Sequence, residues 1–212
     1  NLGVYNSWKA PLSASDFYKV RIIDSVSNEV YDSTAAYFKV GNINITTNLT
    51  GTSIQVGKQL TINWTNTNNI NTVKIELSTN GGSGWSTLTS NYVTGANGGS
   101  YTFTVPNNVT NNAIIKVSDQ NNSNIYSQTA SFTINNLTIT KPITPESWKV
   151  ASTQQIKWTS YNISNVNIYI STNNGANWLL IDNNVTSNNG NNVYNWVVAN
   201  YASNQCLIKI TD

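Results

Sequence analysis

Three aspartates recur at equivalent places in the chain and are its best candidates for a binding site. Asp24, Asp119 and Asp212 each follow a short apolar stretch. An aspartate with asparagine carbonyls around it could bind calcium, which takes about six to eight oxygen ligands. The alternative is that each carboxylate accepts hydrogen bonds from backbone N–H groups of its own turn. Because only one carboxylate recurs at each place, we favour the turn.

Aromatic residues are the second set of candidates. Trp85 and Trp178 each follow a glycine-containing turn, and exposed rings there could stack on sugars. Packing at the rim of the core would need no ligand, and we favour it. Trp64 and Trp158 alternate with polar residues and are predicted to lie in the core. Trp148 has no counterpart elsewhere in the chain, and we expect it at the joint with the preceding repeat or on the surface.

Catalytic chemistry finds little support in the composition. The chain contains no histidine, which removes the commonest general base and the commonest metal ligand together. Its nine carboxylates do not recur as a close pair in every repeat, as a glycosidase-type acid and base would. No glycine-rich loop precedes a helical pattern. We therefore expect no enzyme activity, no catalytic residues and no cofactor.

Asn-x-Ser/Thr sequons could carry N-linked glycans in a host that has the machinery. Many such sequons arise by chance in a chain this rich in Asn and Thr, and Asn63 lies inside a predicted strand. The remaining candidates are Asn44, Asn48, Asn108, Asn121, Asn136, Asn162 and Asn184.

The elements that position these residues are predicted to be short β-strands. Apolar and polar residues alternate along the chain, which is typical of half-buried strands, and no helical pattern is present. The turn Asn80-Gly81-Gly82 suits a hairpin, because glycine adopts positive φ at little cost. About seven strands with turn signals every 8–12 residues or so predict an Ig-like or fibronectin III-like β-sandwich. In one copy the expected strands are residues 43–46, 59–65, 72–78, 85–88, 100–105, 113–118 and 127–134.

Internal repetition organises the whole chain. The stretch from Gln59 to Trp85 returns as Gln154 to Trp178, with the two core tryptophans 94 positions apart (158 − 64). We predict three segments: residues 1–41, the C-terminal half of an Ig-like repeat (the half repeat); residues 42–135, a complete repeat (the second repeat); and residues 136–212, a repeat that lacks its last strand or strands (the third repeat). Because Asn1 falls in the middle of a repeat, we expect a processed or excised piece of a longer chain.

Charge and cysteine content limit the partners. The net charge is +2, and charged residues make up 9% of the chain, against about 25% in an average soluble protein. No basic run is present, so neither nucleic acid nor an anionic membrane is an expected partner. No apolar run approaches the roughly 18 residues of a membrane span. The single cysteine, Cys206, is predicted to be a small apolar residue in a core strand.

Several motifs together carry a resemblance to a known family. Ile156-Lys-Trp-Thr-Ser160 is followed by a Val-x-Ile hairpin that ends at Trp178, and by Cys206-Leu-Ile-Lys-Ile-Thr-Asp212. This pattern resembles the Ig-like repeat of large secreted and cell-surface bacterial proteins. That repeat is related to the Kre9/Knh1-type family of Ser/Thr-rich cell-wall proteins. The chain departs from the pattern where the family has Asp (Asn80 and Asn173), Gly (Asn174) and Pro (Ala199).

The resemblance implies a fold and a setting rather than a catalytic site. It implies an extracellular or cell-surface location, tandem arrays and frequent use in adhesins. We therefore expect a structural or adhesive segment of a long surface protein or filament, whose partners are neighbouring copies or repeats and surface glycans. A strand-exchange variant would let residues 25–40 of one copy complete the sheet after Asp212 in the next. The alternative is an accessory carbohydrate-binding module of a secreted hydrolase.

Overall fold

The described part of the chain is all-β. The computed structural model describes residues 5, 7–9, 13–67 and 69–212, and these residues form strands and turns but no helix. In chain order the strands are β1 (Ser15–Tyr18), β2 (Arg21–Ile23), β3 (Tyr31–Ser33), β4 (Phe38–Val40), β5 (Ile43–Ile45), β6 (Ser53–Gln55), β7 (Gln59–Asn66), β8 (Thr72–Ser78), β9 (Ser86–Val93), β10 (Gly99–Thr104), β11 (Thr110–Asp119), β12 (Tyr126–Gln128), β13 (Phe132–Lys141), β14 (Thr153–Tyr161), β15 (Asn165–Ser171), β16 (Leu179–Thr186), β17 (Gly190–Val197) and β18 (Leu207–Thr211).

The chain divides into two compact units. The first comprises Asn1–Thr50, Leu60–Phe103 and Ile114–Ala130, and the second comprises Gly51–Gln59, Thr104–Ala113 and Ser131–Asp212. Both units take strands from the second repeat, and β11 contributes to each. The segment boundaries at residues 41 and 135 remain predictions. Residues 1–4, 6 and 10–12 of the half repeat, and residue 68 of the second repeat, lie outside the described residues.

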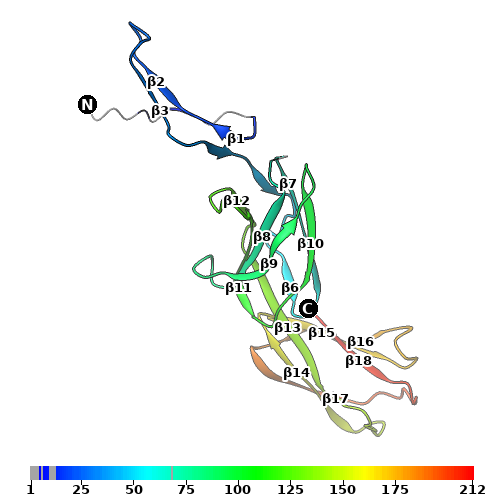
Figure 1. The fold of residues 1–212 in the computed structure, drawn as a ribbon. Coiled ribbons are helices and arrows are strands. Elements are labelled where there is room, and N and C mark those ends of the chain that lie inside the picture. The colour runs from blue at the N-terminus through cyan, green and yellow to red at the C-terminus, as the bar shows by residue number, and fades with distance from the viewer. Residues whose placement is uncertain (1–4, 6, 10–12, 68) are drawn as a thin grey trace. The chain divides into compact units, whose positions relative to one another are not determined.

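The second unit is an Ig-like β-sandwich of two sheets (Figure 1). One sheet has the order β17–β14–β13, and the other has the order β16–β15–β18. β13 also pairs with the start of β11 and, in parallel, with β6. Alternation along β14 turns Ile156 and Trp158 inward. The buried core consists of Ile156, Trp158, Ile163, Val166, Ile168, Ile170, Trp196, Val198 and Ile210.

The first unit contains a sheet of order β10–β7–β5 and a second sheet built around β8. β8 pairs with β9 on one side and with the later part of β11 on the other, and β12 pairs with the far edge of β11. Ile62 and Ile75 are fully buried, and Trp64 is 3% exposed. Since Trp158 is 1% exposed, the predicted core role of both tryptophans is confirmed.

The half repeat forms the same strand ladders as the end of the second repeat. β2 pairs with β3 as β11 pairs with β12, and β1 pairs with β4 as the start of β11 pairs with β13. The burial differs, because Ile22 is 73% exposed whereas its counterpart Val117 is fully buried. The two places therefore share their strand pairing and differ in how far the side chains are buried.

Three sequence predictions are corrected by the structure. Cys206 is exposed, because β18 begins one residue later at Leu207 and leaves the cysteine in the preceding turn. Trp148 lies neither at a joint nor free on the surface. Its ring packs against Trp196 of the same repeat, with 6.1 Å between the ring centroids. The single strand predicted over residues 127–134 is two strands, β12 and β13.

Candidate functional site

Asp24 lies in a turn of the half repeat. Its carboxylate accepts hydrogen bonds from Ser27 Oγ at 2.7 Å, Ser27 N at 3.4 Å and Val26 N at 3.1 Å. The Ser27 hydroxyl, followed by these backbone N–H groups, holds the pKa of Asp24 below its ordinary value of 3.8. All of these donors belong to the turn itself, which is the arrangement expected without a metal.

Asp119, the counterpart in the second repeat, is buried and pairs with a lysine. Its Oδ1 accepts a hydrogen bond from Asn121 N at 3.1 Å, and its Oδ2 lies 2.7 Å from Lys39 Nζ. The lysine also donates to the backbone oxygen of Asn69 at 2.9 Å and lies 3.7 Å from Asp16 Oδ1. The Lys39 ammonium therefore sits among three oxygen groups, two of which are carboxylates.

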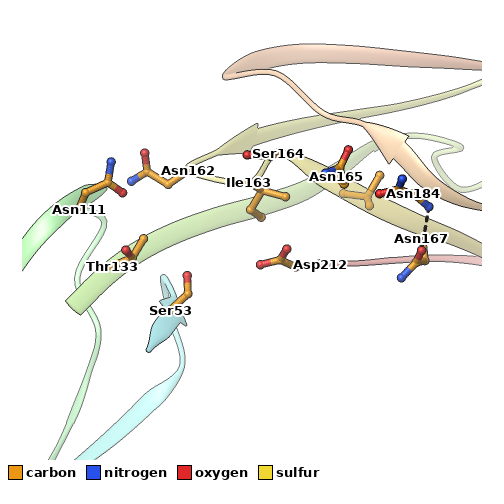
Figure 2. A pocket seen from close by; sticks show the side chains of 11 residues that line it. Ser53, Asn111, Thr133, Asn162, Ile163, Ser164, Asn165, Asn167, Asn184 and Asp212 are labelled. Carbon is orange, nitrogen blue, oxygen red and sulfur yellow. Dashed lines mark hydrogen bonds between the residues drawn. The ribbon is translucent and has the colours of Figure 1, made fainter. Parts of the chain in front are cut away.

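Asp212, the counterpart in the third repeat, is exposed and borders an open pocket of about 400 Å³ in the second unit. Figure 2 shows Asn111, Thr133, Asn162 and Asp212 among the side chains around it. Asp212 Oδ2 lies 3.4 Å from Asn135 Nδ2. Among the described residues no group of three or more His, Cys, Asp or Glu side chains is placed to hold a metal ion. The calcium assignment for the three aspartates remains a prediction.

Trp85 and Trp178 are both half-buried, and each lies under a lysine. Lys116 Nζ is 4.2 Å from the centroid of the Trp85 ring, and Lys209 Nζ is 4.5 Å from that of Trp178. Lys209 also lies 4.7 Å from the ring of Tyr169. Such cation–π contacts stabilise by roughly 0.5–1 kcal/mol at exposed sites. Sequence reasoning missed these lysines, although their recurrence at one repeat position was a usable signal.

The two lysines differ in their acidic partners. Lys116 Nζ lies 2.7 Å from Glu76 Oε2, and Lys74 Nζ lies 2.6 Å from Glu76 Oε1. Burial raises the pKa of Glu76, but hydrogen bonds and charges from Lys116 and Lys74 outweigh this and bring it below the ordinary 4.5. Tyr169 occupies the position of Glu76 in the third repeat, and no carboxylate among the described residues pairs with Lys209.

The turns before both tryptophans are built identically. Ser78 Oγ accepts a hydrogen bond from Gly82 N at 2.8 Å, as Ser171 Oγ does from Gly175 N. Gly82 and Gly175 have φ values of 91° and 88°, which side chains rarely adopt. The asparagines that replace the family's Asp, Asn80 and Asn173, accept hydrogen bonds through Oδ1 from backbone N–H groups four residues on, at 2.8 and 2.9 Å. A neutral amide oxygen thus performs the turn role.

The sequons lie mostly on exposed backbone. Asn136 and Asn162 are half-buried, and Asn162 Nδ2 donates to Ile134 O at 3.1 Å, so a glycan there would replace a structural hydrogen bond. Glycosylation of these sequons remains a prediction. The exposed candidates are Asn44, Asn48, Asn108, Asn121 and Asn184.

Part of the chain matches a known domain family. Residues 48–134 match the family of Kre9/KNH-like N-terminal Ig-like domains. The match supports the family resemblance for this portion of the chain, and the motifs quoted from residues 156–212 lie outside the matched residues. No curated protein matches the chain.

Among solved structures, the fibronectin(III)-like modules of Clostridium thermocellum CbhA match with 13% sequence identity and a TM-score of 0.26. The match covers 74% of this chain and 79% of that one. At this TM-score the likeness supports no conclusion about the present chain, whose fold is described from its own strands. Among the described residues, no helix has the length and apolar character that crossing a bilayer requires.

Proposed function

We propose that the chain is a non-catalytic structural and adhesive segment of a long extracellular protein built from tandem Ig-like repeats. The observation that supports this most strongly is β13, a single strand from Phe132 to Lys141. It pairs with β11 of the second repeat and with β14 of the third, so no loop separates the two repeats. A joint without a flexible linker suits an array that transmits force.

Material isolated from the natural source tests this proposal. Intact mass spectrometry and negative-stain microscopy should show these residues inside a much heavier chain or a thin fibre. A stable 23.2 kDa monomer at the cell surface or in the medium would contradict the array.

The proposal includes strand complementation between neighbours. β11 has β8 on one edge and β12 on the other, whereas its counterpart β18 pairs with β15 and with no other described strand. Backbone groups on an open edge favour the addition of a strand. Residues 25–40 contain the counterpart of β12 and would pair with β18. Ser33 would then lie opposite Lys209, as Gln128 lies opposite Lys116.

A peptide of residues 25–40 provides the test. It should bind the full chain and slow hydrogen exchange of the outward-facing amides of β18. The matched control is the same peptide with Asp32→Pro, which removes one backbone donor from the strand. Equal binding of both peptides, or no protection of β18, would contradict this mode of assembly.

A carbohydrate-binding module is the second candidate. Its support is the half-buried Trp178 beside Tyr169, since aromatic faces on an open sheet can stack on sugars. A glycan array should then show binding that Trp178→Ala removes and Trp85→Ala leaves intact. If no glycan on the glycan array binds the protein, the carbohydrate-binding function is excluded.

A further inference from the structure

The Lys39 cluster in the first unit has a counterpart in the second unit without the lysine. Asn69 Nδ2 donates to Val40 O at 3.1 Å, and Asn162 Nδ2 donates to Ile134 O at the same distance. This shared contact makes Asn69 and Asn162 structurally equivalent. The repeat alignment then pairs Asp119 with Asp212, Asp16 with Asn111, and Lys39 with Thr133.

The presence of Thr133 where the first unit has Lys39 changes both the charge and the space beside the aspartate. Thr133 ends at a hydroxyl and a methyl group, so the volume that the Lys39 side chain occupies in its cluster becomes part of the pocket of about 400 Å³. The pocket keeps the carboxylate of Asp212 and the polar groups of Asn111 and Asn162. Ile163 and Val166 add an apolar lining.

A buried amide, that of Asn135, lies beside Asp212. Asn135 is 5% exposed, its Nδ2 donates to Ser53 Oγ at 2.9 Å, and its Oδ1 has no hydrogen-bond partner. Asn135, Ser53 and Asp212 together line the adjoining pocket. Because Asn135 Oδ1 is closed off from solvent, the amide offers no acceptor to a ligand in the pocket of about 400 Å³, and its contribution is the contact of Nδ2 with Asp212 Oδ2 at 3.4 Å.

We propose that this pocket binds a primary ammonium group on an alkyl chain, as in a lysine side chain or a small aliphatic amine. The ammonium donates to the Asp212 carboxylate, as Lys39 Nζ does to Asp119 in the first unit, and the methylene groups contact Ile163 and Val166. A calcium ion fits less well, because a single carboxylate is present and the pocket is far larger than an ion. The proposal stands independently of the proposed array.

Titration of the full chain with n-butylammonium chloride at constant ionic strength tests the site. We expect saturable binding with a dissociation constant on the order of millimolar, the range open to so small a ligand. Asp212→Asn should weaken binding about tenfold or more, because it removes a charge-assisted hydrogen bond. Thr133→Lys should abolish binding by placing an ammonium group in the pocket.

The first unit provides the matched reversal. Lys39→Thr should open an equivalent pocket at Asp119, and n-butylammonium should restore part of the lost thermal stability, whereas n-butanol should not. Asp24→Asn removes the equivalent carboxylate of the half repeat, which accepts hydrogen bonds from its own turn and does not line the pocket, and should leave amine binding unchanged. Tighter binding of a lysine peptide would identify a protein lysine as the source, and tighter binding of 1,5-diaminopentane a free amine.

Three results would overturn the proposal. One is the absence of saturable amine binding. Another is equal binding by the wild type, Asp212→Asn and Thr133→Lys. The third is stabilisation by calcium that Thr133→Lys removes while amines have no effect.

Discussion

The second and third repeats place a lysine over a tryptophan at the same point of the same sheet, but only the second gives that lysine a carboxylate. Glu76 bridges Lys116 and Lys74 in the second repeat, whereas Tyr169 and Asn167 occupy the equivalent positions in the third. Beneath this face the interiors agree. Trp64 Nε1 donates to Thr94 Oγ1 at 3.1 Å, and Trp158 Nε1 donates to Ser187 Oγ at 2.9 Å. The two repeats have equivalent interiors and differ in the chemistry of one sheet face.

The largest expected effect tests the shared core. Trp158→Ala and Trp64→Ala should each lower the free energy of unfolding by about 3–5 kcal/mol, because each opens a cavity and leaves a hydroxyl without its donor. Chemical denaturation followed by circular dichroism measures the loss. If one substitution cost less than about 1 kcal/mol, the two interiors would not be equivalent.

Loss of the Glu76 carboxylate, which pairs with both Lys74 and Lys116, should have the next largest effect on the free energy of unfolding. Glu76→Gln should destabilise by about 1–3 kcal/mol, since two partly buried lysines lose their charge partner. Tyr169→Phe, the matched change in the third repeat, should stay within about 0.5 kcal/mol. Equal losses for both would show that Glu76 is not the feature that separates the two faces.

Low pH should remove the difference in stability between the wild type and Glu76→Gln. The pKa of Glu76 in the folded chain lies below its ordinary value of 4.5. Its stabilising effect is therefore fully present above that pH and is lost as the pH falls through the folded pKa. Unfolding of wild type and Glu76→Gln at a series of pH values from 7 to about 2 should show two curves that converge in acid. Curves that stay parallel would place the pH dependence elsewhere.

The smallest expected effect concerns the hairpin turns that the repeats share. Asn80→Ala and Asn173→Ala should each cost about 0.5–1.5 kcal/mol, because each removes one hydrogen bond from a turn. Asn80→Asp and Asn173→Asp should retain most of the stability, since a carboxylate oxygen can accept the same bond. Thermal unfolding of the four variants would measure this, and a loss confined to one repeat would mean that the turns are not equivalent.

Much of this fold was predictable because its signals are local. The alternation around Ile62 and Trp64 located β7, and Asn80-Gly81-Gly82 located the turn after β8. The prediction of Cys206 as a core residue was wrong. Cys206 begins an apolar run that continues with Leu207, but the strand begins at Leu207 and does not include the cysteine. Periodicity defines a strand but gives its ends poorly.

The candidate site was less predictable, since its contacts join distant residues. Asp119 was identified as a candidate because it recurs in the repeats. Its partner Lys39 lies 80 positions earlier (119 − 39), and the equivalent position of the next repeat holds Thr133, so repetition did not mark the lysine. The replacement of Lys39 by Thr133 acquired meaning only when Asn69 and Asn162 were seen to make the same hydrogen bond.

The sequence by itself determined the all-β class, the repeated strands and the two core tryptophans. Side-chain alternation and glycine turns act over a few residues, and repetition marks them twice. Only the tertiary structure decided which charges are paired, that Trp148 packs on Trp196, and that the lysines lie over tryptophans. These contacts depend on how strands far apart in the chain lie in register, which local periodicity does not encode.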